Sequence, residues 1–298
     1  MKVKVIPSGI SSLDGLLDGG FPAGSLVLLL GEIGSGNREF AMSSLIMLAA
    51  IKAGHLPPPH EANIVLPKEI WWVTLTRSPS DLMNEVAMSL DKDLYAPFEK
   101  RVKFADLSKD YFMTSPVPLE WVSEELAASK RAEKLASLAD ALAGLRMAMG
   151  GPPTKPKGAI KSLADFLSKH AKGNVVFIHS LTDLARLYSD TEARQYELML
   201  FLRGLQRAAK GWGGLIYTDL TANLFDKRME EEIASCADSV LVFEWEKAGP
   251  IQRRRLLYLK KFYGLSTRPE VLTRFEVNIT SSTGLYIVRP EVIEGLRR

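Results

Sequence analysis

Residues 25–54 read SLVLLLGEIGSGNREFAMSSLIMLAAIKAG. Residues 25–30 form a short apolar run, which is typical of a strand buried in a parallel sheet. A glycine-rich loop follows, and the segment after it has the composition of a helix that ends on Gly54 as a C-cap. A strand, a glycine loop and a helix in this order predict an α/β fold.

The loop itself keeps the spacing of a phosphate-binding loop, in which a glycine, four free positions and a glycine precede Lys and then Ser or Thr. Its residues are Gly31, Glu32, Ile33, Gly34, Ser35 and Gly36. The next two positions depart from the pattern, because Asn37 stands where the lysine belongs and Arg38 where the hydroxyl belongs. The stretch leaves three interpretations open: a working nucleotide site, a modified one, or a loop that has kept only its shape.

Composition places the chain among ordinary globular proteins, with 46% hydrophobic and 24% charged residues in 298. The net charge of +3 is too small to indicate nucleic-acid binding. Cys236 is the single cysteine, so neither an intrachain disulfide nor a cysteine-pair metal motif can form. We find no signal-peptide pattern near residue 1 and no apolar run of about 18 residues. These features predict a cytoplasmic protein that does not associate with membranes.

Strands and helices are predicted to alternate along most of the chain. Strands are expected at 25–30, 70–75, 101–107, 174–181, 213–218 and 239–244, and helices at 37–54, 80–90, 159–171 and 192–209. Ser80 is the expected N-cap of the second helix. The fold class is therefore α/β with a mostly parallel central sheet, within a single domain spanning 1–298. We expect an enlarged helical insertion over 112–172, including an Ala- and Leu-rich helix at 119–149, and an antiparallel, β-rich C-terminal part over 250–298.

The segment before the first strand carries a family resemblance. SGISSLDGLLDGGFPAG, residues 8–24, resembles the opening of the RecA/KaiC/RadA-type P-loop ATPases. The matching residues are Ser8, Gly9, Leu13, Asp14, Gly19, Gly20, Pro22 and Gly24. NVVFIHSLTDL (174–184) is similar to the second nucleotide motif of that family, and RRLLYLKKFYGLST (254–267) is similar to its C-terminal segment. The resemblance implies a RecA-like P-loop domain, and it fails over about 54–68 and 112–172.

The resemblance also implies what an active site would contain. ATP hydrolysis needs the loop lysine on the phosphates, and a hydroxyl and a strand-end aspartate on Mg²⁺; the family adds a glutamate that activates water. Here the lysine position is Asn37, the hydroxyl is Arg38, the aspartate is His179, and the acidic pair falls on Thr76 and Arg77. All of these losses affect one reaction, so we predict a degenerate ATPase with no catalytic residues and no metal site.

The replacements make the site more basic, which suggests a role for the retained backbone cradle. One hypothesis is that the loop, with Thr76, His179 and Arg38 around it, holds ATP or another nucleotide or anion without Mg²⁺. The opposite interpretation is that Arg38 pairs with Glu32 or Glu39 and that the loop binds nothing.

The C-terminal segment matches the family only in part. Lys261 takes the lysine position of the Lys-x-Arg-Gly finger that reaches a neighbouring subunit's nucleotide, and Gly264 takes the glycine, but Tyr263 replaces the arginine. Lys260, Lys261 and residues 253–255 also form a basic ribbon. We favour a solvated hairpin face over contact with single-stranded DNA.

These observations predict a binding, scaffold or regulatory subunit. Related ATPases form rings or filaments, so the expected partners are copies of the chain or an active RecA-like paralogue. Two alternatives stay open. One is an ATPase of the recombination-repair or KaiC-like type with non-standard catalytic residues, such as Lys261 from a neighbour; the other is a DNA-binding module.

Overall fold

The computed structural model describes residues 3–59, 63–113, 115–118, 121–122, 158–249, 252–263 and 274–288. Most of the helix predicted at 119–149, and with it most of the expected insertion, lies outside these residues. The division of the chain into one domain with an insertion therefore stays a prediction.

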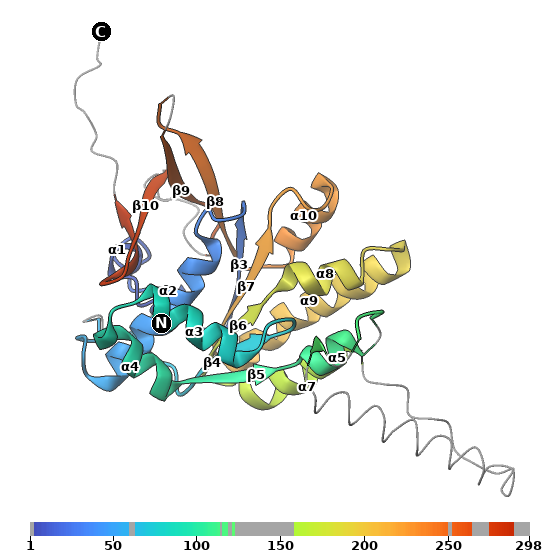
Figure 1. Ribbon diagram of the computed structural model, residues 1–298, viewed down its shortest axis with the longest axis horizontal. Helices are drawn as coiled ribbons and strands as arrows, with labels where there is room; N and C mark the ends of the chain where they lie inside the picture. The colour runs from blue at the N-terminus through green and yellow to red at the C-terminus, as the bar shows by residue number, and fades with distance from the viewer. Residues whose placement is uncertain are drawn as a thin grey trace, which may run out of the picture.

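One large sheet organises the described chain, in the strand order β11-β10-β9-β8-β3-β7-β6-β4-β5 (Figure 1). The strands are β3 (Ser25–Gly31), β4 (Ile70–Thr74), β5 (Val102–Asp106), β6 (Val175–His179), β7 (Leu215–Thr221), β8 (Ser239–Lys247), β9 (Arg253–Lys261), β10 (Phe275–Thr280) and β11 (Gly284–Val288). The six strands from β8 to β5 run parallel, and β9, β10 and β11 add antiparallel strands beside β8. This arrangement confirms the predicted fold class.

Helices cover both faces of the sheet (Figure 1). They are α1 (Ser11–Asp14), α2 (Asn37–Ala53), α3 (Pro79–Ser89), α4 (Lys92–Arg101), α5 (Ser108–Phe112), α7 (Ala159–His170), α8 (Leu181–Leu187), α9 (Glu192–Trp212) and α10 (Lys227–Ser235). The expectation that Ser80 caps α3 was wrong, because the cap is Ser78, whose hydroxyl accepts a hydrogen bond from the N–H of Asp81. Among the described residues, no helix combines the length and apolar character needed to cross a bilayer.

Strand β3 lies between two hydrophobic cores because its side chains alternate between the faces of the sheet. Val27 and Leu29 pack in the core beneath α2 and α4, and Leu28 packs in the core beneath α7, α8 and α9. A central strand buried on both sides explains why its sequence is continuously apolar. The same burial fixes the position of the glycine loop at the carboxyl end of β3.

The leader that carried the family resemblance has a structural role. The buried Asp14 carboxylate accepts hydrogen bonds from the N–H and the hydroxyl of Ser8, at 2.8 and 2.7 Å, and from the N–H of Gly9 at 3.0 Å. Gly9 has φ +79°, and a Cβ at this position would lie 2.8 Å from Met47 of α2. The leader therefore packs against α2, where only glycine fits. The leader also contacts the C-terminal strands, because the hydroxyl of Ser12 accepts a hydrogen bond from the N–H of Ile287 on β11.

Candidate nucleotide-loop site

The glycine loop and the neighbouring strand ends form one edge of the sheet. Gly31, at the end of β3, pairs with Thr221 at the end of β7, and the Thr221 N–H donates to the hydroxyl of Thr182 after β6. His179 ends β6 and pairs with Thr74 at the end of β4. Carboxyl ends of parallel strands are where open α/β sheets bind ligands. The structure thus places the predicted loop, Thr76 and His179 along the same edge.

The loop backbone has the conformation of an anion cradle. Gly34 and Gly36 have φ of +75° and +114°, which other residues rarely adopt. The N–H groups of Ile33, Gly34 and Gly36 donate no hydrogen bond to any other described residue. Gly36 precedes α2 as its N-cap without a side-chain cap, so the free N–H groups of the first helical turn lie beside those of the loop. Such N–H groups can surround an anion without any charged side chain.

The Asn37 side chain lies beneath the loop instead of in the cradle. It is 7% exposed, and its Cγ and Cβ lie 2.7 and 2.8 Å from where a Cβ on Gly31 would be. Its nearest recorded acceptor is the carbonyl of Leu29, 3.5 Å from Nδ2, which is a long contact. The hydroxyl of Ser35 is also directed inward, donating to the carbonyl of Glu32 at 2.7 Å. The side chain at the lysine position therefore fills space below the loop and presents no positive charge.

Arg38 is paired with an acid that sequence reasoning did not find. Its Nη2 lies 2.6 Å from Glu85 Oε2 on α3, and Arg77 binds the same carboxylate oxygen. The alternative in which Arg38 pairs with Glu32 or Glu39 was therefore wrong about the partner of Arg38. Burial raises the pKa of Glu85, but the hydrogen bonds from the two guanidinium groups outweigh it and hold the pKa below its usual value. One carboxylate thus neutralises part of the positive charge of Arg38 and Arg77 at this edge.

The remaining predicted positions also have partners. His179 Nδ1 lies 3.2 and 3.1 Å from the two carboxylate oxygens of Asp219 on β7, with its ring beside Trp72. Thr76 donates to Asp183 at 3.0 Å, as does Ser180 at 2.9 Å. Among the described residues, no group of three or more His, Cys, Asp or Glu side chains is arranged to hold a metal.

The hairpin of strands β8 and β9 contacts the carbonyl groups of the glycine loop. Trp245 Nε1 on β8 donates to the carbonyl of Ile33 at 3.1 Å, and Arg255 Nε on β9 donates to the carbonyl of Gly34 at 3.0 Å. The Arg255 guanidinium lies over the Trp245 ring, 4.7 Å from its centroid. Glu32 contacts the same hairpin, accepting from the Trp245 N–H at 3.4 Å. These contacts hold the carbonyls of Ile33 and Gly34, whereas the N–H groups of both residues donate to no described residue.

The basic ribbon is largely engaged within the chain. Lys261 Nζ donates to the carbonyls of Ser235 and Ala237 at the end of α10, at 3.0 and 2.6 Å. Ion pairs join Lys260 to Glu231 and Arg254 to Glu246. These partners are those of a structural hairpin face, and Lys261 lies away from the glycine loop of its own chain.

Of three comparisons with known proteins, the one with solved structures found matches. No family model matches the sequence, and no curated protein matches it. Many solved structures share the fold; one is the KaiC-like protein of the hyperthermophilic archaeon Pyrococcus horikoshii OT3, with a TM-score of 0.58 and 19% identity, covering 97% of this chain and 100% of that one. The chain therefore has the RecA-like fold that its leader implied, and at this identity the likeness concerns the fold alone.

Proposed function

We propose that the chain is a non-catalytic RecA-like P-loop protein that acts as a binding, scaffold or regulatory subunit. The observation that carries the proposal is the pairing of Arg38 with Glu85. At the position where an ATPase places a metal-binding hydroxyl, this chain has a fixed cation that already holds a carboxylate. A guanidinium there repels a divalent ion and supplies none of its ligands.

The other residues at the loop do not fit magnesium-bound ATP either. Asn37 is uncharged and turned beneath the loop, and His179 is bound to Asp219 beside Trp72. Asp183 and Asp219 each already accept hydrogen bonds from neighbouring side chains. Because positioning and charge stabilisation account for most of the rate in phosphoryl transfer, their loss predicts negligible turnover.

Anion binding by the loop backbone is a separate part of the proposal. The unpaired N–H groups of Ile33, Gly34 and Gly36 support it, since they need no metal to accept phosphate oxygens. The pairing of Arg38 and Arg77 with Glu85 limits it, because neither guanidinium is left to add its full charge. We therefore expect a nucleotide to bind weakly and with the same affinity in the presence and absence of Mg²⁺.

A turnover assay tests the catalytic part. Wild-type protein and the Asn37→Ala variant should release phosphate from ATP at the same background rate, with and without Mg²⁺. The double variant Asn37→Lys/Arg38→Ser should remain at background as well, because His179 still stands at the aspartate position. Magnesium-dependent turnover that falls on Asn37→Ala would refute the proposal and favour the ATPase alternative.

Calorimetry tests the binding part on the same protein. We expect equal heats for ATP with Mg²⁺ and with EDTA, and weaker binding when Ile33→Pro, at a residue without a positive φ, removes an N–H from the cradle. Heat that requires Mg²⁺ contradicts metal-free binding. If neither titration releases heat, the protein does not bind ATP. The proposal would then be limited to a scaffold role, with a glycine loop that binds no ligand.

The proposed scaffold role also requires that the chain assembles with a partner. We propose this because related ATPases form rings or filaments. Size-exclusion chromatography with light scattering should give a mass that is a multiple of 33.0 kDa, or a monomer that joins an active RecA-like paralogue when the two are mixed. A monomer that joins neither would remove the scaffold role. In the ATPase alternative Lys261 acts on a neighbour, and it would first have to leave the carbonyls of Ser235 and Ala237.

A further inference from the structure

One face of helix α9 carries large apolar side chains that lie exposed to solvent. Tyr196 is 65% exposed and Leu200, one turn further along, is 52% exposed. Residues three or four apart share one face of a helix. The exposed stripe on this face consists of Ala193, Tyr196, Leu200 and Gly204. The opposite face of α9 is buried in the core beneath the sheet, so the stripe is the side from which a partner could approach.

Gly204 is a second unusual feature of this stripe. A glycine inside a helix costs about 1 kcal/mol relative to alanine. A Cβ on Gly204 would meet nothing within 4 Å, so no contact within the described chain requires a glycine there. A residue without a side chain does, however, allow another molecule to approach the helix closely.

The charged side chains on this face are divided between its two halves. Four of them make no ion pair with any other described residue, and these are Glu192, Glu197, Arg203 and Arg207. The two acids lie in the amino-terminal half, and the two arginines lie in the carboxyl-terminal half. The helix dipole acts on charges in the first and last turns, which does not include Glu197 or Arg203. Arg203 and Arg207 are like charges one turn apart, an arrangement that disfavours an isolated helix.

We propose that this face binds the same face of a second copy of the chain, with the two α9 helices antiparallel and Leu200 at the centre of the contact. This inference rests on the assembly proposed above and names its surface. The antiparallel direction brings Glu192 and Glu197 of each copy beside Arg203 and Arg207 of the other, so that opposite charges meet. A parallel direction would bring like charges together. The contact has two-fold symmetry and therefore closes after two copies.

The same arrangement accounts for the glycine. Tyr196 and Gly204 are each four residues from Leu200, so the Tyr196 ring of one copy lies level with Gly204 of the other, where no side chain blocks it. The competing explanation is that Tyr196 and Leu200 are isolated apolar residues of the kind that most protein surfaces carry. That explanation predicts a monomer whose mass does not depend on the charges of α9.

Light scattering over a concentration series tests the proposal, because one helix from each copy makes a small interface and therefore a weak dimer. The wild-type mass should rise toward twice 33.0 kDa. Two charge reversals, Glu192→Arg/Glu197→Arg and Arg203→Glu/Arg207→Glu, should each stay at 33.0 kDa, because these four side chains then all have one sign. An equimolar mixture of the two variants should recover the mass of a dimer, since each supplies the charge that the other lacks.

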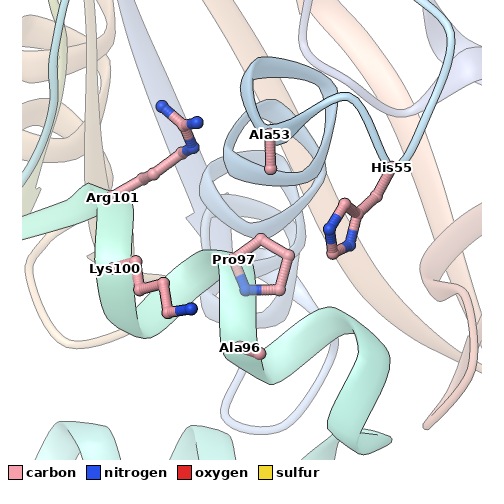
Figure 2. A pocket seen from close by; sticks show the side chains of 6 residues that line it. All are labelled: Ala53, His55, Ala96, Pro97, Lys100 and Arg101. Atoms are coloured by element: carbon pink, nitrogen blue, oxygen red, sulfur yellow. The ribbon is translucent and has the colours of Figure 1, made fainter.

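Matched controls come from surfaces outside this face. The depression between the ends of α2 and α4 is lined by Lys100 and Arg101, whose side chains point apart (Figure 2). Lys100→Glu/Arg101→Glu makes the same charge change there as the arginine reversal on α9, and it should leave the wild-type mass unchanged. Leu200→Asp should prevent dimer formation, whereas Met88→Asp, at an exposed residue of α3, should not. Thermal unfolding checks that each variant has folded.

Three outcomes would overturn the proposal. A wild-type mass of 33.0 kDa throughout the series would exclude the dimer, while leaving an active paralogue as the partner in the proposed function. A larger wild-type mass that both charge reversals retain would place assembly on another surface of the chain. Failure of the mixed variants to form a dimer would show that the acidic and basic halves of α9 do not face each other in two copies.

Discussion

Glu85 carries much of the charge balance beside the glycine loop, since its carboxylate binds both Arg38 and Arg77. Its pKa is lowered in the folded protein. The stabilisation from this group is therefore complete at pH values above the ordinary pKa of 4.5, and it is lost as the pH falls through the lower folded value.

Glu85→Gln should reduce the free energy of unfolding by about 1 kcal/mol at pH 7, after allowing for solvent screening of a pair about one third exposed. The deficit relative to wild type should shrink when the pH falls below about 4.5, because the wild-type carboxylate then becomes neutral too. Urea unfolding at several pH values measures both effects. Asp81→Asn, which removes the exposed partner of Arg77 on the same helix, should cost less than half as much. A deficit that is constant with pH would contradict the assigned role of Glu85.

The departures of this site from the P-loop pattern could be predicted from the sequence, but the partners of the residues concerned could not. The spacing of the glycine loop identified Asn37 and Arg38, and the strand pattern identified His179, because both patterns are local. Glu85 follows Arg38 by 47 residues and Asp219 follows His179 by 40, so these pairs arise only when α2 meets α3 and β6 meets β7. A signal did exist for Asp219, since a charged residue within the apolar run of β7 requires a buried partner.

Helix α3 carries Glu85, and Ser78 caps the N-terminus of this helix. Ser78→Ala should destabilise the protein by about 1 kcal/mol, because the N–H of Asp81 loses the acceptor that caps it. Ser80→Ala should be close to neutral, since its hydroxyl contacts only that of Ser78. Chemical unfolding of the two variants measures the difference. If Ser80→Ala were the more damaging change, the helix would begin two residues later than in this structure.

Strands were easier to predict than helices in this protein. Buried parallel strands appear as apolar runs bounded by polar residues, and each strand expected from such a run is present. Helix α4 was missed because Pro97 interrupts its pattern, and α10 because most of its residues are charged. Asp226, which caps α10 by accepting from the N–H of Met229, was a start signal that the sequence did contain. Such short helices are stabilised mainly by packing.

At the scale of the whole molecule, one buried carboxylate joins elements that are far apart in the chain. Asp238 is 4% exposed and accepts hydrogen bonds from the N–H of Leu26 on β3, at 2.9 Å, and from Gln206 on α9, at 3.0 Å. Its charged partner is Lys210, whose ammonium lies 2.8 Å from Oδ2. The central strand β3, helix α9 and the start of β8 are therefore connected at a single point.

Asp238→Ala should cost about 2–3 kcal/mol, because it leaves the Leu26 N–H and the Gln206 amide without their acceptor, whereas the Lys210 side chain is 42% exposed and can be hydrated. The matched control is Asp190→Ala, which breaks the exposed pair with Arg194 and should cost less than about 1 kcal/mol. Urea unfolding followed by circular dichroism and by tryptophan fluorescence measures both variants. If the chain folds as the single domain predicted from its sequence, the two probes should report one shared transition that shifts as a unit in Asp238→Ala. Separate transitions, with only one of them shifted, would show that the C-terminal strands unfold apart from the parallel sheet.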